Sequence, residues 1–311
     1  MIHFRVRNGA ILRIAALCVA ALFLTACSRS NTEIRPDELP SPVVRVIEAT
    51  LTPSATATPL PTYTPSPTAT NTATLTPQWI LNESGYAAVP ILLYHHISDE
   101  QPFSRFYVGP AAFEEQMRSL QDWGYTTISM SLFIEALTEG AELPPRPIVI
   151  TFDDGHSSVY ENAFPVMQEL GFIGVNYIVA TRLESENFMD TEQLLEMQDA
   201  GWEVGGHSMT HSDLTEIHDE ARYEILEPRL ILEEALGSDV DTFAYPFGAI
   251  DSFVADRVQD YGYSAGIGLG PSWEHGWATL FYISRIEVYG GTDLAGFAGI
   301  LPWSGPLVIG D

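Results

Sequence analysis

The feature that most constrains this chain is an apolar run that ends on two adjacent acids and a glycine. Residues 148–155 read IVITFDDG, which is typical of a buried β-strand that delivers carboxylates to the edge of a sheet. Adjacent side chains of an extended strand point in opposite directions, so Asp153 and Asp154 are predicted to have separate tasks unless the chain turns there. Gly155 supplies that turn, because glycine tolerates backbone conformations that other residues avoid.

A second strand-like run further along the chain leads into two histidines. Residues 202–206 read WEVGG and continue into HSMTH, in which His207 and His211 are four positions apart. Two imidazoles at this spacing on a helical turn face one centre. Together with one carboxylate they make a three-ligand metal site that leaves coordination positions open for water.

Strand-like and helix-like segments alternate over most of the chain, which predicts an α/β fold with a parallel sheet covered by helices. Because polar residues stand at the C-terminal ends of several strands, a barrel with its site on that rim fits better than an open sheet. The expected strands are 89–97, 126–128, 148–154, 174–180, 202–206, 241–248, 263–268 and 282–288, and the expected helices are 109–120, 130–137, 163–170, 190–200, 221–236 and 253–261.

The N-terminal segment has the pattern of an export signal. Three arginines precede an apolar run at 14–24 that closes on Leu-Thr-Ala-Cys, and the run is too short to span a bilayer comfortably as a mature helix. With Cys27 at the end of the cleavage box, the stretch resembles a bacterial lipoprotein signal, which implies cleavage before Cys27 and diacylglycerol on its sulfur. We therefore expect a signal peptide at 1–26 and an extracytoplasmic protein that is lipid-anchored to the cell membrane. An ordinary signal peptide that releases the protein is the alternative.

Residues 28–77 are rich in Thr, Pro, Ala and Ser. They offer too little apolar surface to fold, so we expect the lipidated Cys27 to be followed by a disordered tether, 27–85, and then by one catalytic domain, 86–311. The chain has 14 basic residues, all arginine, against 41 acidic ones. Such a surface repels nucleic acid and anionic headgroups, so nucleic acid is not an expected partner and the membrane is contacted only through the lipid anchor.

Three motifs in one order, TFDDG at 151–155, HSMTH at 207–211 and YPFG at 245–248, resemble the polysaccharide deacetylases (the NodB-homology domain, carbohydrate esterase family 4). The likeness covers about residues 86 to 300. It implies a distorted, incomplete (β/α) barrel and a metal-dependent hydrolase that removes N-acetyl groups from N-acetylglucosamine units of a cell-surface or extracellular polysaccharide. The expected partner is an N-acetylated glycan polymer. The expected cofactor is one divalent ion, Zn²⁺ first, with Co²⁺ or Ni²⁺ as alternatives.

The chemistry of the motifs assigns a role to each polar side chain. A Zn²⁺ held by Asp154, His207 and His211 would lower the pKa of bound water to about 7. Asp153, beside the metal but not on it, is placed to take the proton as general base. In the family the tetrahedral oxyanion is also stabilised by the backbone N–H of the aromatic residue after the proline of the third motif, here Phe247.

The acid that protonates the leaving amine departs from the common family pattern. Most members carry a late Leu-x-His, yet no histidine follows His275. The early sequence LYHH at 93–96 resembles the arrangement in deacetylases of poly-β-1,6-N-acetylglucosamine, in which the acid precedes the TFDDG motif. On that likeness His95 is the acid, with His96 as its fallback and an ordinary buried strand-end histidine as the alternative.

The third motif shows another departure. The common family has arginine two places before the proline, where this chain has Ala244, and we predict that Arg285 takes over the role of orienting the base. The remaining motif also resembles the exopolysaccharide branch, so exopolysaccharide is favoured over peptidoglycan as the substrate. Tyr245, Pro246 and Trp273 are candidates for sugar contact, with core packing as the alternative for Trp273.

Three other functions stay open at this point. One is a catalytically weak glycan-binding lipoprotein of the same fold, and another is a structural surface protein whose tether matters more than its site. The third is an O-acetyl esterase acting on xylan, because the same chemistry suits an ester and the leaving alcohol needs less help from an acid.

Overall fold

The computed structural model describes residues 78–307. The predicted signal peptide, Cys27 and the tether up to residue 77 lie outside the described residues, so those expectations stay predictions. Among residues 78–307, none of the helices combines the length and the apolar character that crossing a bilayer requires.

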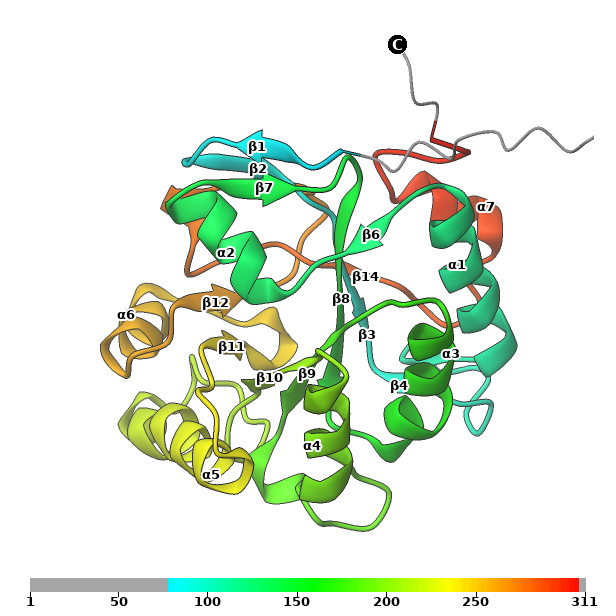
Figure 1. Cartoon of the computed structure of the whole chain (residues 1–311). Coiled ribbons are helices and arrows are strands. Elements are labelled where there is room, and N and C mark those ends of the chain that lie inside the picture. Colours follow the sequence, from blue (N-terminus) through cyan, green and yellow to red (C-terminus); the bar gives the residue numbers. More distant parts are fainter. Residues whose placement is uncertain (1–77, 308–311) are drawn as a thin grey trace, which may run out of the picture. The chain divides into compact units, whose positions relative to one another are not determined.

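A curled sheet of eight strands forms the centre of the fold (Figure 1). Seven strands run in the order β12-β11-β10-β9-β8-β3-β14, β6 adds to β8, and neighbouring strands are parallel. A parallel bridge between Ile267 and Ile283 brings the chain that leads into β14 beside β12, the strand at the opposite edge. The sheet therefore curls into an incomplete barrel, as predicted. The strands are β3 (Ile91–Tyr94), β6 (Thr126–Thr127), β8 (Pro147–Asp154), β9 (Val175–Ile178), β10 (Glu203–Gly206), β11 (Thr242–Ala244), β12 (Ala265–Ile267) and β14 (Ile286–Glu287).

The helices cover the outside of this sheet (Figure 1). They are α1 (Pro110–Asp122), α2 (Met130–Thr138), α3 (Phe164–Glu169), α4 (Thr191–Asp199), α5 (Glu227–Leu236), α6 (Ser252–Asp260) and α7 (Leu294–Gly299). The helix predicted over 221–236 is divided: a π-helical turn, Arg222–Leu226, precedes α5, whose second residue is Pro228. Proline has no backbone N–H to continue an α-helical ladder, so the wider turn falls just before it.

Three small pairs of strands lie around the main sheet: β1 (Ile80–Asn82) with β7 (Ala141–Leu143), β2 (Tyr86–Ala88) with β13 (Glu274–Gly276), and β4 (His96–Ile97) with β5 (Tyr107–Val108). The pairing of β1 with β7 extends the folded structure into the last residues of the segment that composition assigned to the tether. The strand expected over 282–288 is shorter than predicted and covers only β14.

The burial of β8 explains why its sequence is a continuous apolar run. Ile148, Ile150 and Phe152 pack into the cluster beneath the helices, whereas Val149 packs into a second cluster inside the barrel. Because side chains alternate along a strand, Asp153 shares the interior side with Val149. The register of one strand therefore directs the first of the two acids into the barrel.

Candidate active site

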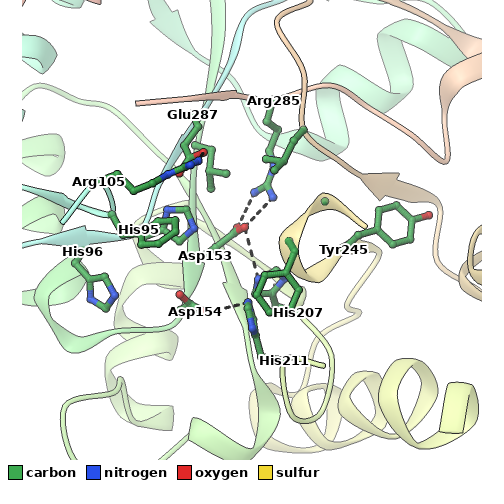
Figure 2. A pocket seen from close by; sticks show the side chains of 15 residues that line it. His95, His96, Arg105, Asp153, Asp154, His207, His211, Tyr245, Arg285 and Glu287 are labelled. Carbon is green, nitrogen blue, oxygen red and sulfur yellow. Dashed lines mark hydrogen bonds and ion pairs between the residues drawn. The ribbon is translucent and has the colours of Figure 1, made fainter. Parts of the chain in front are cut away.

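Most of the predicted site residues meet at the C-terminal rim of the sheet, where parallel strands place their ends together. The end of β8 supplies Asp153 and Asp154, and the loops that follow β10 and β11 supply the histidine pair and the third motif. These groups surround a cavity of about 340 Å³ (Figure 2). It is lined by Leu93, His95, His96, Arg105, Phe106, Asp153, Asp154, His207, His211, Tyr245, Phe247, Gly248, Leu269, Arg285 and Glu287.

Asp154, His207 and His211 form a group that could hold one metal ion, since their ligand atoms all lie within 4.8 Å of one another. His207 Nδ1 lies 2.8 Å from the carbonyl oxygen of Ala244. A carbonyl only accepts, so Nδ1 carries the proton and Nε2 keeps its lone pair for a ligand, as is usual for a metal-binding histidine. Burial first, and then the neighbouring His207, lower the pKa of His211 to about 4, which keeps this imidazole in the neutral form that binds metal.

Asp154 reaches this group because the strand turns at its last residue. Asp154 and Gly155 both have left-handed backbones, with φ of 76° and 77°, so the carboxylate of Asp154 points to the rim and not to the face opposite Asp153. Its Oδ1 accepts a hydrogen bond of 2.7 Å from Arg182 and lies 3.4 Å from His211 Nε2. Burial raises the pKa of Asp154, but the nearby His207, His211, His95 and Arg182 together outweigh it and lower the pKa overall.

Asp153 is fixed by Arg285 in a fork-to-fork pair (Figure 2). Arg285 Nη1 and Nη2 donate to the two carboxylate oxygens at 2.6 and 2.7 Å, and the guanidinium also donates to Thr151 Oγ1 and to the carbonyl of Gly268. The two residues are only 3% and 1% exposed. Burial would raise the pKa of Asp153, but Arg285 and then His207 lower it to about 2. The structure thus places the predicted orienting residue on the predicted base, which is ionised at neutral pH.

His95, the predicted acid, lies between β3 and β4 and lines the same cavity (Figure 2). Its ring packs edge-on against Phe106, with centroids 4.8 Å apart. Burial is the main influence and lowers the pKa of His95, while the carboxylates of Asp153, Asp154 and Glu287 oppose it. The pKa of His95 is therefore set by two opposing influences within the site: burial lowers it and the three carboxylates raise it.

His96, the fallback acid, also lines the cavity but is packed differently. It stacks on Tyr107 with centroids 4.1 Å apart and meets His156 edge-on at 4.4 Å. Burial, and then His156, lower its pKa to about 4. Its Nδ1 is buried and has no hydrogen-bond partner in the part of the chain that the structure describes.

The third motif is divided between the cavity and the core. Phe247 has a left-handed backbone, φ 61°, and its exposed ring lies edge-on to His211 with centroids 4.6 Å apart. Tyr245 lines the cavity although its ring is buried, and its hydroxyl donates to the carbonyl of Phe281. Pro246 and Trp273, both predicted to contact sugar, are not among the cavity-lining residues; Trp273 packs against the core.

Two charged residues of the cavity were not predicted from the sequence. Glu287, on β14, pairs with Arg105 Nη2 at 2.5 Å, while its second oxygen is buried without a hydrogen-bond partner among residues 78–307. Arg105 in turn lies over the ring of Tyr289, 4.6 Å from its centroid. The pairing of β14 with β3 sets Glu287 opposite Leu93, two residues before His95. Glu287 could have been predicted as a site residue only from the pairing of β14 with β3, and no local sequence motif indicates that pairing.

A buried glutamate also holds the loop that carries the two histidines. The carboxylate of Glu224, in the π-helical turn before α5, accepts hydrogen bonds from the backbone N–H groups of Met209 and Thr210 and from the Thr210 hydroxyl. These bonds measure 2.6–3.1 Å, and the carboxylate is buried. Glu224 therefore fixes the backbone between His207 and His211.

The sheet is a curled parallel half-barrel, and polar residues from the ends of five of its strands, β3, β8, β10, β11 and β14, surround one cavity. This arrangement defines an enzyme of the incomplete (β/α)-barrel class. The sequence profile of the polysaccharide deacetylases matches residues 140–266, which contain all three motifs. The segment that holds the predicted site therefore has the sequence pattern of the polysaccharide deacetylase family.

Known proteins with similar sequences or structures agree with this assignment. YxkH of Bacillus subtilis, whose name places it among the polysaccharide deacetylases, is 24% identical over 227 residues, 73% of this chain and 80% of that protein. The poly-β-1,6-N-acetyl-D-glucosamine N-deacetylase of Staphylococcus aureus is 22% identical over 209 residues, 62% of this chain and 72% of that enzyme. The crystal structure of BC0361, a polysaccharide deacetylase from Bacillus cereus, superposes with a TM-score of 0.62 and 29% identity over 69% of each chain.

Proposed function

We propose that this polysaccharide deacetylase is a metal-dependent enzyme that removes N-acetyl groups from N-acetylglucosamine units of an extracellular or cell-surface polysaccharide, with exopolysaccharide favoured over peptidoglycan. The observation that supports this proposal most strongly is that the two adjacent acids have different partners and therefore different roles. Asp153 is locked to Arg285 inside the barrel, whereas Asp154 joins His207 and His211 at the rim. The similarity to the Staphylococcus aureus enzyme and the early His95 support the choice of glycan.

The donor set fits one divalent ion. One carboxylate oxygen and two imidazole nitrogens make a three-ligand site of the kind that catalytic zinc uses, and Co²⁺ and Ni²⁺ accept the same donors. The hydrogen bond from His207 Nδ1 to Ala244 fixes the tautomer that such a site needs. When bound, the ion would polarise the acetyl carbonyl and lower the pKa of the attacking water.

The protein's own groups move the protons. Asp153 is ionised at neutral pH and held in one orientation, so it can accept the proton of the attacking water without first losing one of its own. His95 then gives a proton to the leaving amine. Burial lowers the pKa of His95 and so reduces its protonated fraction at a given pH, whereas the carboxylates of Asp153, Asp154 and Glu287 favour the protonated form that can donate. The backbone N–H of Phe247 is the proposed donor to the oxyanion.

Acetate release from defined glycans tests the proposal. The full-length chain is supplied with Zn²⁺ and offered β-1,6-linked N-acetylglucosamine oligomers, chitin oligomers and acetylated xylan, with Asp153→Asn as the control. We expect acetate from the β-1,6-linked oligomers, and a rate about 10²- to 10⁴-fold lower for the control. Release from xylan alone would favour the O-acetyl esterase. No release from any glycan would leave a glycan-binding protein.

We further propose that the enzyme works outside the cytoplasm, anchored by a lipid on Cys27. The signal-like segment at 1–26 and the Thr/Pro-rich composition of 28–77 support this location. Replacing Cys27 by alanine should move the protein from the membrane fraction to the soluble fraction. An unchanged distribution of the Cys27→Ala variant would refute the lipid anchor and leave the proposed chemistry untouched.

A further inference from the structure

A second groove lies beside the active-site cavity and has no part in the chemistry described above. It has a volume of about 840 Å³ and runs between α6 and the chain around the 3₁₀ turn Trp277–Thr279. Its lining residues come from two short segments, 250–259 and 277–282. Volumes of about 300–1,000 Å³ are typical of sites that bind small molecules or parts of polymers.

The groove exposes two large aromatic rings that the backbone holds in place. Trp277 is 66% exposed, and its backbone is fixed by hydrogen bonds to Gly85 and Leu280. Tyr282 is 43% exposed, and its ring lies so close to the Gly268 backbone that a Cβ there would come within 2.8 Å of it. Neither ring is buried in the core of the domain, so each offers apolar surface to a ligand in the groove.

The polar residues of the groove suit hydroxyl groups. Ser252, Gln259 and Thr279 contribute neutral side chains, and Asp251 contributes a carboxylate that also pairs with His218 at 2.8 Å. Rigid aromatic faces combined with a few hydrogen-bonding groups match a pyranose ring, which has an apolar face and a polar rim. The carboxylate of Asp251 would in addition favour a sugar unit whose amine has been freed.

The groove and the active-site cavity share a wall. Gly248 and Leu269 line the cavity, while Ile250 and Tyr282 line the groove. The Tyr282 hydroxyl donates to the Leu269 carbonyl at 3.4 Å, and the 3₁₀ turn Pro246–Gly248 leads directly into Ile250. A glycan whose reacting unit lies in the cavity could therefore continue into the groove.

We infer that this groove is a second binding site that holds further sugar units of the glycan chain whose acetamide lies in the active-site cavity. The inference rests on the proposed function for its choice of glycan. It makes Trp277 a residue that sets the preference for long substrates. Deacetylation of a short oligomer does not require it.

The test compares substrate lengths in the full-length enzyme. β-1,6-linked N-acetylglucosamine oligomers from dimer to hexamer are used as substrates for the wild type, Trp277→Ala, Trp277→Phe and the control Trp79→Ala, which removes another exposed tryptophan that lines neither cavity. For Trp277→Ala we expect KM for the hexamer to rise about 2- to 12-fold, the range for loss of one aromatic contact, with kcat/KM for the dimer unchanged. Trp277→Phe should keep most of the length dependence, and Trp79→Ala all of it.

Binding is measured separately so that the two proposals can fail independently. In an Asp153→Asn background, calorimetry with the hexamer should show the same 2- to 12-fold weakening when Trp277 is replaced by alanine. If the wild type binds the hexamer through Trp277 but releases no acetate, the proposed deacetylase activity is refuted, while the proposed role of the groove in glycan binding is supported. Equal affinity with and without Trp277 would refute the groove. The groove would also be refuted if Trp277→Ala bound the hexamer as tightly as before and lost only the ability of the chain to self-associate.

Discussion

Replacing Arg285 by methionine should destabilise the protein more than any surface substitution. The change removes the guanidinium that makes two bonds of 2.6 and 2.7 Å to Asp153 and leaves that carboxylate buried. Removing one partner of a buried pair costs about 3–5 kcal/mol. Arg285, together with His207 and His95, lowers the pKa of Asp153 from 3.8 to about 2 in spite of its burial, and this net shift corresponds to about 2 kcal/mol. The burial penalty that then remains uncompensated adds to this loss.

The loss should depend on pH in a defined direction. In the wild type the folded-state pKa of Asp153 is lowered, so its stabilising contribution is present above about 3.8 and is lost as the pH falls towards about 2. In Arg285→Met, burial should instead raise the pKa of Asp153 above its unfolded value, so the penalty is complete at neutral pH and disappears as the carboxyl group becomes protonated. The difference between the two proteins should therefore be largest at pH 7 and shrink towards pH 4.

Chemical denaturation at pH 7 and at pH 4 measures both effects. The control is Arg118→Met, which removes an exposed arginine paired with Glu114 and Glu169 and should change the free energy of unfolding by about 0.5 kcal/mol or less. The double variant Arg285→Met with Asp153→Asn should recover part of the lost stability, because no charge is left unpaired. A loss below about 1 kcal/mol at pH 7, or a loss that grows towards pH 4, would refute this account of the pair.

The remaining predictions concern the acid and the histidine loop. His95→Gln should lower the rate of acetate release about 10²- to 10⁴-fold at an unchanged melting temperature, whereas His96→Gln should lower it less than tenfold; the reverse order would transfer the acid role to His96. Glu224→Gln should weaken zinc binding about 10-fold, measured by competition with a chromogenic chelator, because the loop between the two histidines loses its charged acceptor. An unchanged zinc affinity would show that the loop is fixed without Glu224.

Those parts of the site that follow from a single strand end could be predicted from the sequence. Asp153 and Asp154 close an apolar run, and the alternation of side chains along β8 already separates their roles. His207 and His211 stand in one short motif, so their approach to one centre could be predicted. The helical turn expected between them is wrong: the segment is a loop with left-handed backbones at Ser208 and His211, held by Glu224. The parallel sheet followed from the alternation of strands and helices, because neighbouring parallel strands require a crossover between them. The barrel followed from the polar residues at the C-terminal ends of several strands.

Other parts depend on which strands become neighbours, and the sequence does not carry that information locally. Glu287 reaches His95 only because β14 pairs with β3, and Arg182 reaches Asp154 from a 3₁₀ turn after β9. Trp273, for which core packing was the alternative, depends on tertiary contacts in the same way. An aromatic residue in a loop is equally suited to sugar stacking and to core packing, and only the tertiary contacts decide between them.

Titration of the metal-free enzyme with Zn²⁺ tests the central claim most directly, namely that Asp154, His207 and His211 together hold one catalytic ion. The full-length chain is first treated with a chelator, and acetate release from a β-1,6-linked N-acetylglucosamine oligomer is then followed as zinc is added. The account predicts almost no release without metal and a rate that rises to a plateau at one equivalent. Full activity in the metal-free enzyme, or a plateau that His211→Ala leaves unchanged, would contradict it.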